Sequence, residues 1–199
     1  MPFALVVPAK ELAHAKSRLE IGARRRSLAV AFAADAVAAA VQSEQVSAVY
    51  VVTDDPALAD IARLLGAVVL PDEGHGDLNE VLRAAVGRLP HSAVAAMCAD
   101  LPCLTTDHLS AALEEMPRRG MGFVPDHVGT GTTLLAARNV AEFNPQFGPG
   151  SCAAHLNAGA IELAAGQTLR LDVDTMADLA AARHLGVGLH TKRVLDADD

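Results

Sequence analysis

Short apolar runs alternate with longer helical patterns through the first 120 residues of the chain. The runs predict buried strands, because a sheet that is covered on both faces has nearly continuous apolar sequence. The predicted strands are residues 3–7, 47–52, 67–70 and 93–99, and the predicted helices are residues 25–41, 57–66, 78–89 and 105–116. This β-α repeat predicts a three-layer α/β fold with a mostly parallel, right-handed sheet.

The second half of the chain is less regular, and its elements follow a different order. The residues predict strands at 122–126 and 131–138, a Gly- and Pro-rich loop at 143–150, a helix at about 151–164, a strand at 168–174 and a helix at about 176–184. Residues 195–199 are polar, and we expect them to be frayed. Neither a repeat nor a linker interrupts the pattern, so residues 1–199 are predicted to form a single domain.

The composition excludes several classes of protein. Hydrophobic residues make up 51% of the 199-residue chain and the formal net charge is −8, so it is globular and unsuited to wide nucleic-acid binding. Three cysteines without CxxC spacing and eight histidines without zinc-ligand spacing argue against disulfide and zinc sites, and most histidines are expected on the surface. The apolar stretch 28–41 contains Asp35, which indicates a buried helix rather than a membrane span. We expect a cytoplasmic protein without membrane contact.

Three cations follow the first predicted strand in this otherwise acidic chain. They are Lys10, Lys16 and Arg18. Ligands of open parallel sheets bind at the carboxyl ends of strands, so these side chains are candidates for holding an anion, although a solvated basic surface would give the same pattern. The chain lacks both GxGxxG and GxxxxGK[ST], which removes the main support for a dinucleotide oxidoreductase or a P-loop NTPase.

Carboxylates follow two later strands. Asp100 ends the fourth strand, while Asp172 and Asp174 lie two residues apart and therefore on one face of an extended segment. Carboxylates of this kind suit Mg²⁺, which takes one or two of them together with substrate phosphates. The alternatives are a turn residue for Asp100 and a helix cap for Asp174, a role that Thr175 could equally take.

Two further segments allow both a structural and a binding role. Before the third helix, Asp77 can cap the helix and Asn79 can contact a base. In "FNPQFGPGS" (143–151), Gly148 leaves a backbone N–H accessible, and Ser151 stands where a helix N-terminus favours anions. Ser151 as a plain N-cap explains the same letters.

Seven pieces of sequence occur in order over nearly the whole chain. They are "VVPAKELAHAKSRL", "VVTDD", "GHGDLNEVL", "ADLPCL", "GTGTTLL", "FGPGSCAAH" and "LRLDVDTMADL". As an ordered set they resemble the CofC/FbiD guanylyltransferases of coenzyme F-420 biosynthesis. The resemblance implies a Rossmann-like nucleotidyltransferase fold with a substrate-binding insertion, and a reaction that joins GTP to a phosphorylated three-carbon acid and releases pyrophosphate.

The resemblance also implies roles for the candidate residues. The acid would be bound by Thr133, Gly148 and Ser151. The nucleotide would be bound by Lys10, Lys16 and Arg18 at its triphosphate and by Asp77 and Asn79 at its base and ribose. Mg²⁺ would be held by Asp100 and one of Asp172 and Asp174.

The expected acid is phosphoenolpyruvate, because the Ala- and Arg-rich composition is typical of actinobacteria, where family members use it. The product would be enolpyruvoyl-2-diphospho-5'-guanosine, and a downstream deazaflavin transferase would receive it. 2-Phospho-L-lactate and 3-phosphoglycerate remain open as acids, and the oligomeric state, including a homo-oligomer, is also open. Two other functions are a molybdenum-cofactor guanylyltransferase and a non-catalytic nucleotide-binding domain. The "FGPGS" loop argues against the first, and the retained carboxylates and lysines argue against the second.

Overall fold

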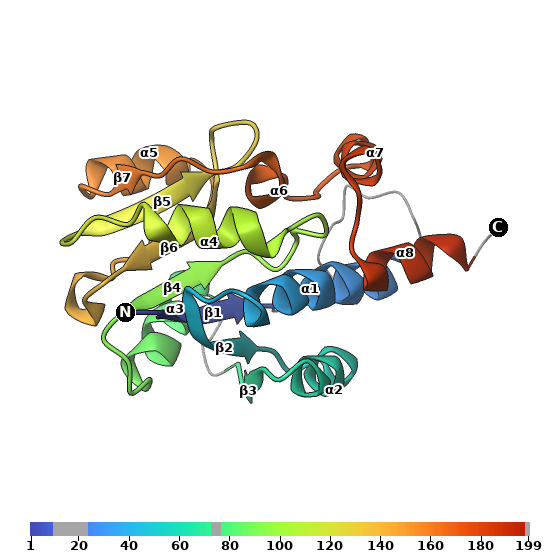
Figure 1. Cartoon of the computed structure of the whole chain (residues 1–199), viewed down its shortest axis with the longest axis horizontal. Helices are drawn as coiled ribbons and strands as arrows, with labels where there is room; N and C mark the ends of the chain where they lie inside the picture. Colours follow the sequence, from blue (N-terminus) through green and yellow to red (C-terminus); the bar gives the residue numbers. More distant parts are fainter. Residues whose placement is uncertain (10–23, 73–76, 198–199) are drawn as a thin grey trace.

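A computed structural model describes residues 1–9, 24–72 and 77–197 of the chain. Helices pack on both faces of a central sheet, which confirms the predicted three-layer α/β fold (Figure 1). The predicted triphosphate ligands Lys10, Lys16 and Arg18 lie outside the described residues. None of the helices in the described part of the chain has the length and apolar character that a membrane span requires.

The sheet has the strand order β3-β2-β1-β4-β6-β5-β7. The strands are β1 (Phe3–Pro8), β2 (Val46–Val52), β3 (Val68–Leu70), β4 (Val94–Met97), β5 (Met121–Pro125), β6 (Thr132–Ala137) and β7 (Ile161–Glu162). β6 runs antiparallel to both β4 and β5, whereas all other neighbours are parallel. β5 therefore points in the same direction as β1, β2 and β4. The turn that follows β5 lies at the sheet edge where the carboxyl ends of those strands meet.

The helices follow the predicted order in the first half of the chain. They are α1 (Arg25–Val41), α2 (Pro56–Leu64), α3 (Leu78–Gly87), α4 (Thr106–Glu114), α5 (Ser151–Asn157), α6 (Gln167–Arg170), α7 (Met176–Leu185) and α8 (Leu189–Asp196), with a 3-10 turn η2 (Val140–Glu142). Asp55 and Asp77 cap α2 and α3 by accepting hydrogen bonds from two backbone N–H groups each, as their positions before the helices predict.

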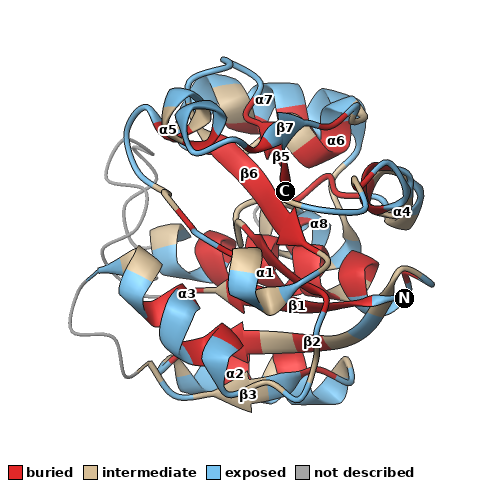
Figure 2. Ribbon diagram, turned by 90° about the vertical axis from the view of Figure 1, so that its left-hand side faces the viewer, coloured by how far each residue is buried: buried red, intermediate tan, exposed pale blue. Residues whose placement is uncertain are grey.

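Two apolar cores lie on the two faces of the sheet, and alternate residues of each strand contribute to them. Phe3, Leu5 and Val7 of β1 face α1, α2 and α4, while Ala4 and Val6 face α3. Figure 2 shows the buried residues concentrated in the strands and on the helix sides that cover them. Because aromatic residues are scarce, Ala, Val and Leu supply most of this core, as expected for close packing of helices on a sheet.

Three predicted elements are wrong in the C-terminal half. The strand expected at 168–174 is the short helix α6 followed by an extended segment, because Leu169 packs in one core cluster and Leu171 in another. The helix expected to reach residue 164 ends at Asn157, and Gly159 then takes a positive φ of 84° that favours glycine. Leu195 and Asp196, expected to be frayed, belong to α8.

Helix α8 lies beside α1 (Figure 1). A buried carboxylate joins the two helices. Asp35, in the middle of α1, accepts hydrogen bonds from the backbone N–H groups of His190 and Thr191, both at 2.9 Å. These are orphan N–H groups of the first turn of α8, which have no partner within a helix. At Gly188 an added Cβ would lie 2.3 Å from the Cγ of Asp35, so only glycine allows this close approach.

Candidate active site

A backbone hydrogen bond places the predicted metal ligands together. The N–H of Val173 donates to the carbonyl oxygen of Asp100 at 3.0 Å, which sets the segment 171–174 beside the end of β4. Burial, together with the charges of Asp100, Asp174 and Asp126, raises the pKa of Asp172 to about 6. The predicted carboxylates therefore do share one place at the carboxyl edge of the sheet.

Asp172 is the better placed of the two alternatives for a ligand beside Asp100. Its side chain is 21% exposed and partly enclosed, whereas Asp174 lies exposed on the surface. The cap of α7 is Thr175, which forms a capping box with Asp178, so the alternative role of Asp174 as the cap is wrong. Within the described ranges, no group of three His, Cys, Asp or Glu side chains is arranged to hold a metal by itself. A pair of carboxylates that shares a cation with substrate phosphates is consistent with this arrangement.

His127 lies between two carboxylates at the same edge. Its Nδ1 is 3.4 Å from Oδ1 of Asp172, and its Nε2 is 3.4 Å from Oδ1 of Asp178. No local pattern marks this histidine, because its contacts are with residues 45 and more positions later in the chain. A cleft of about 550 Å³ adjoins it, lined by His127, Ala165, Gln167, Arg170, Leu171, Ala181, His184 and Leu185.

The turn after β5 is built around a second buried carboxylate. Asp126 is 8% exposed and accepts hydrogen bonds from the N–H groups of Gly129, Thr130 and Gly131 at 2.6, 2.9 and 2.8 Å. Thr130 in turn accepts a hydrogen bond from the backbone N–H of Cys152 at 3.1 Å. Asp126 thus fixes the turn against the start of α5. A short Asp-x-x-Gly spacing was the only sequence signal for it.

The structure brings two of the three predicted acid ligands to the beginning of α5. Gly148 is exposed with φ 136°, and its carbonyl oxygen accepts a hydrogen bond from the N–H of Ser151 at 3.0 Å. Ser151 is 2% exposed and is the first residue of α5. The alternative role of Ser151 as the N-cap is wrong, because Gly150 occupies that position with φ 75°.

Thr133, the third predicted acid ligand, is fully buried where β6 begins. Its hydroxyl lies 2.7 Å from the carbonyl oxygen of Leu169 and 3.4 Å from that of Val124. A hydroxyl has one proton to donate, and these carbonyls accept it. Thr133 therefore ties β6 to α6, and its contact with an acid stays a prediction.

The two predicted base and ribose ligands both have partners within the protein. The Asp77 carboxylate caps α3. The Asn79 side chain donates to the carbonyl oxygen of Phe147 at 3.0 Å and accepts from the N–H of the same residue at 2.8 Å. Asn79 therefore lies against the 143–150 loop, and contact of either residue with a nucleotide stays a prediction.

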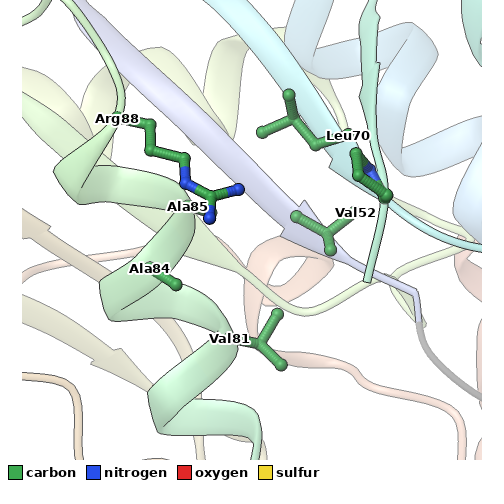
Figure 3. Close-up of a pocket in the computed structure, with 7 residues that line it drawn as sticks. Val52, Leu70, Val81, Ala84, Ala85 and Arg88 are labelled. Atoms are coloured by element: carbon green, nitrogen blue, oxygen red, sulfur yellow. The ribbon is translucent and has the colours of Figure 1, made fainter. Parts of the chain in front are cut away.

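A small apolar pocket lies at the carboxyl ends of β2 and β3. Figure 3 shows Val52 and Leu70 of these strands facing Val81 and Ala85 of α3, with the Arg88 side chain extending into the pocket from the end of the helix. The pocket belongs to the same sheet edge as the carboxylates, on the α3 side.

His155 is a structural residue that sequence reasoning missed by placing most histidines on the surface. It is fully buried, and burial lowers its pKa to about 4. The N–H of Gln146 donates to Nε2 at 2.9 Å, so the ring proton resides on Nδ1, which lies 2.9 Å from the hydroxyl of Thr132. His155 thereby connects the 143–150 loop to β6.

The family of the chain follows from a comparison over nearly its full length. A family model described as "Guanylyl transferase CofC like" matches residues 3–196. The chain belongs to this family. The family predicted from the ordered sequence pieces is therefore confirmed.

Two curated relatives of this CofC-like chain have the same name. A protein from Thermomonospora curvata named phosphoenolpyruvate guanylyltransferase is 47% identical over 96% of this chain and 87% of its own length. A protein of the same name from Streptomyces scabiei is 48% identical over 96% of this chain and 94% of its own length.

Solved structures confirm the nucleotidyltransferase fold of this CofC-like chain. A nucleotidyl transferase from Methanothermobacter thermautotrophicus superposes with a TM-score of 0.64 at 16% identity and covers 92% of this chain and 97% of its own. A 4-diphosphocytidyl-2C-methyl-D-erythritol synthase from Anaerococcus prevotii gives a TM-score of 0.65 at 9% identity and covers 92% and 95%. Identities this low show the fold alone.

Proposed function

We propose that this protein is a phosphoenolpyruvate guanylyltransferase, which condenses GTP with phosphoenolpyruvate to enolpyruvoyl-2-diphospho-5'-guanosine and pyrophosphate. The observation that carries the proposal is the identity of 47% and 48%, over 96% of this chain, to relatives with that name. The proposal includes a place in coenzyme F-420 biosynthesis, in the cytoplasm, with the product passed to a deazaflavin transferase. These parts rest on the family resemblance.

The proposed reaction is an in-line displacement at phosphorus. An oxygen of the acid's phosphate forms a bond to the α-phosphorus of GTP, and the bond from that phosphorus to the bridging oxygen of the β-phosphate breaks, so that pyrophosphate leaves with the electron pair. The attacking group is already an anion, so a side chain is needed neither as a nucleophile nor as a base. The work of the protein is to hold two negatively charged substrates in line.

The acid would be held at the start of α5. The Gly148 backbone N–H and the Ser151 hydroxyl are the donors there, since both residues lie within one turn that the Ser151 N–H to Gly148 carbonyl hydrogen bond closes. Because α5 is only seven residues long, these individual donors matter more than a helix dipole. Lys10, Lys16 and Arg18 would bind the triphosphate, and Asp77 would bind the nucleoside.

Asp100 and Asp172 would hold Mg²⁺. The donor set fits this ion, because both side chains offer hard carboxylate oxygens in a partly buried place and leave coordination positions for substrate phosphates. The ion, when bound, would neutralise charge on the triphosphate. Asp174, which is exposed beside them, would be a secondary ligand.

The test is pyrophosphate release by the purified protein with GTP and Mg²⁺. Phosphoenolpyruvate, 2-phospho-L-lactate and 3-phosphoglycerate are compared, and the deazaflavin transferase with its deazaflavin is included to trap the labile product. We expect turnover with phosphoenolpyruvate. Turnover with another acid alone would keep the reaction and change the substrate. GTP binding without turnover of any acid would favour the non-catalytic alternative.

A further inference from the structure

Three consecutive residues of the 143–150 loop are each held by a side chain from outside the loop. The carbonyl oxygen of Pro145 accepts from Nη2 of Arg83 at 3.2 Å. The N–H of Gln146 donates to His155 at 2.9 Å, and Phe147 is held at both its N–H and its carbonyl by Asn79. Asn79 and Arg83 lie four residues apart on α3, which puts them on one face of that helix.

The pairing of Asn79 with Phe147 fixes the direction of one particular donor. The carbonyl of Phe147 and the N–H of Gly148 belong to the same peptide unit, which is planar and trans. Since the carbonyl oxygen points at Nδ2 of Asn79, the Gly148 N–H must point in the opposite direction, away from α3. Asn79 thereby determines the direction of the N–H that we propose as a ligand of the acid.

The side-chain contacts of Phe147 hold this residue in place, while Asn79 sets the direction of its carbonyl. Its ring packs edge-on against the buried ring of His155, with centroids 5.4 Å apart and an interplanar angle of 78°. His155 is in turn fixed by Thr132 of β6. After Phe147 the chain turns at Gly148, whose φ of 136° is one that other residues rarely adopt. The loop is therefore shaped before a ligand arrives.

We infer that Asn79 is a positioning residue. It aims the Gly148 N–H at the phosphate or the carboxylate of the acid. The inference rests on the proposed function. It replaces the predicted contact of Asn79 with the guanine base by a role on the other substrate. The oxygen and the nitrogen of the Asn79 side-chain amide are both engaged with Phe147, which leaves the side chain little capacity to read a base.

The test compares Asn79→Ala with wild type and with Glu80→Gln, a neutral control on the next, exposed residue of the same helix turn. Without Asn79 the peptide is free to rotate, so we expect the KM for the acid to rise about tenfold or more, the loss of a single well-directed hydrogen bond. The KM for GTP should stay within about twofold and kcat within about threefold, since neither depends on this donor. Glu80→Gln should leave all three constants unchanged.

Several outcomes would overturn the inference. An acid KM equal to that of Glu80→Gln would show that Asn79 does not orient the donor, and a rise in the KM for GTP alone would restore the base contact. Equal rises in both constants would indicate a general structural role. If Asn79→Ala melts well below wild type, the isosteric Asn79→Asp serves instead, because it also lacks the donor to the Phe147 carbonyl, and the same rise in acid KM is expected.

The wild-type assay distinguishes a failure of the proposed function from a failure of the role inferred for Asn79. Absence of turnover with every acid tested would overturn the proposed function and this inference with it. Wild-type turnover together with an unchanged acid KM in Asn79→Ala would overturn this inference alone.

Discussion

Val173 donates a backbone hydrogen bond to the carbonyl oxygen of Asp100, over a distance of 3.0 Å. This contact brings Asp172 within electrostatic reach of Asp100 at the carboxyl edge of the sheet. Two carboxylates in a partly buried place repel each other, which costs free energy unless a proton or a cation lies between them. Costs of this kind concentrate at functional sites.

Replacing either carboxylate by its amide should stop catalysis without unfolding the protein. For Asp100→Asn and Asp172→Asn we expect kcat to fall about 100-fold or more, because holding the proposed cation contributes several kcal/mol to the transition state. Pyrophosphate release measures the effect. The control is Asp60→Asn, which changes an exposed carboxylate on α2 and should retain full activity. Near wild-type turnover of Asp100→Asn would refute the metal assignment.

Asp172 should also make stability depend on pH in a direction opposite to that of most carboxylates. Its folded-state pKa of about 6 lies above the ordinary value of 3.8, so the folded protein binds this proton more tightly than the unfolded chain does. Wild type then loses stability as pH rises from 3.8 to about 6. Asp172→Asn lacks this loss, so the melting temperature of the variant relative to wild type should increase by about 2–5 °C across that window in the presence of a chelator. A difference that does not change with pH would contradict the burial of Asp172 beside the other carboxylates.

The buried His155 should make stability depend on pH in the opposite direction, so that the protein loses stability as pH falls. The pKa of His155 falls from 6.5 to about 4 on folding, so its contribution to stability is complete above pH 6.5 and is lost as pH falls toward 4. His155→Gln should show a shallower loss of stability over this range. Because the window overlaps that of Asp172, the comparison is made in an Asp172→Asn background, with urea midpoints at several pH values. Parallel curves for the two proteins would show that the ring is not buried in its neutral form.

The buried carboxylate of Asp35 should contribute strongly to stability. Asp35→Ala leaves the N–H groups of His190 and Thr191 buried without their acceptor, and we expect the free energy of unfolding to fall by about 2–4 kcal/mol. Gly188→Ala should be destabilising as well, because its Cβ would collide with Asp35. Urea denaturation measures both, and Asp60→Ala serves as the neutral control. A change of less than about 0.5 kcal/mol in Asp35→Ala would show that α8 is not held by this carboxylate.

The elements that the sequence predicted well are those determined by local pattern. The alanine-rich helix was predicted at 25–41 and is observed at Arg25–Val41, since a helix buried over most of its length is apolar throughout. Asp55 and Asp77 cap their helices because the capping bonds reach only two or three residues ahead. The order of strands and helices in the first half follows from the same local signals.

The elements that were missed depend on contacts between distant residues. Leu169, Leu171 and Val173 alternate as in a strand, yet Leu169 packs in one cluster and the other two in another, and the strand does not form. The position of His155 depends on Thr132, and that of α8 depends on Asp35, 156 residues before Thr191. At the candidate site the resemblance named Asp100 and one of Asp172 and Asp174, whereas the pairing of Asn79 with Phe147, 68 residues away, had no local signal.

The hydrogen bonds from α8 to Asp35 also bear on how the chain is made. During synthesis Asp35 of α1 leaves the ribosome 155 residues before its partner His190 and 156 residues before its partner Thr191. Until these residues emerge, a chain that had already packed α1 on the sheet would carry a buried carboxylate without its hydrogen-bond donors, which is unfavourable. Burial of Asp35 with its hydrogen bonds satisfied is thus delayed until α8 is available, and a nascent chain cut short before residue 190 would carry this unsatisfied carboxylate.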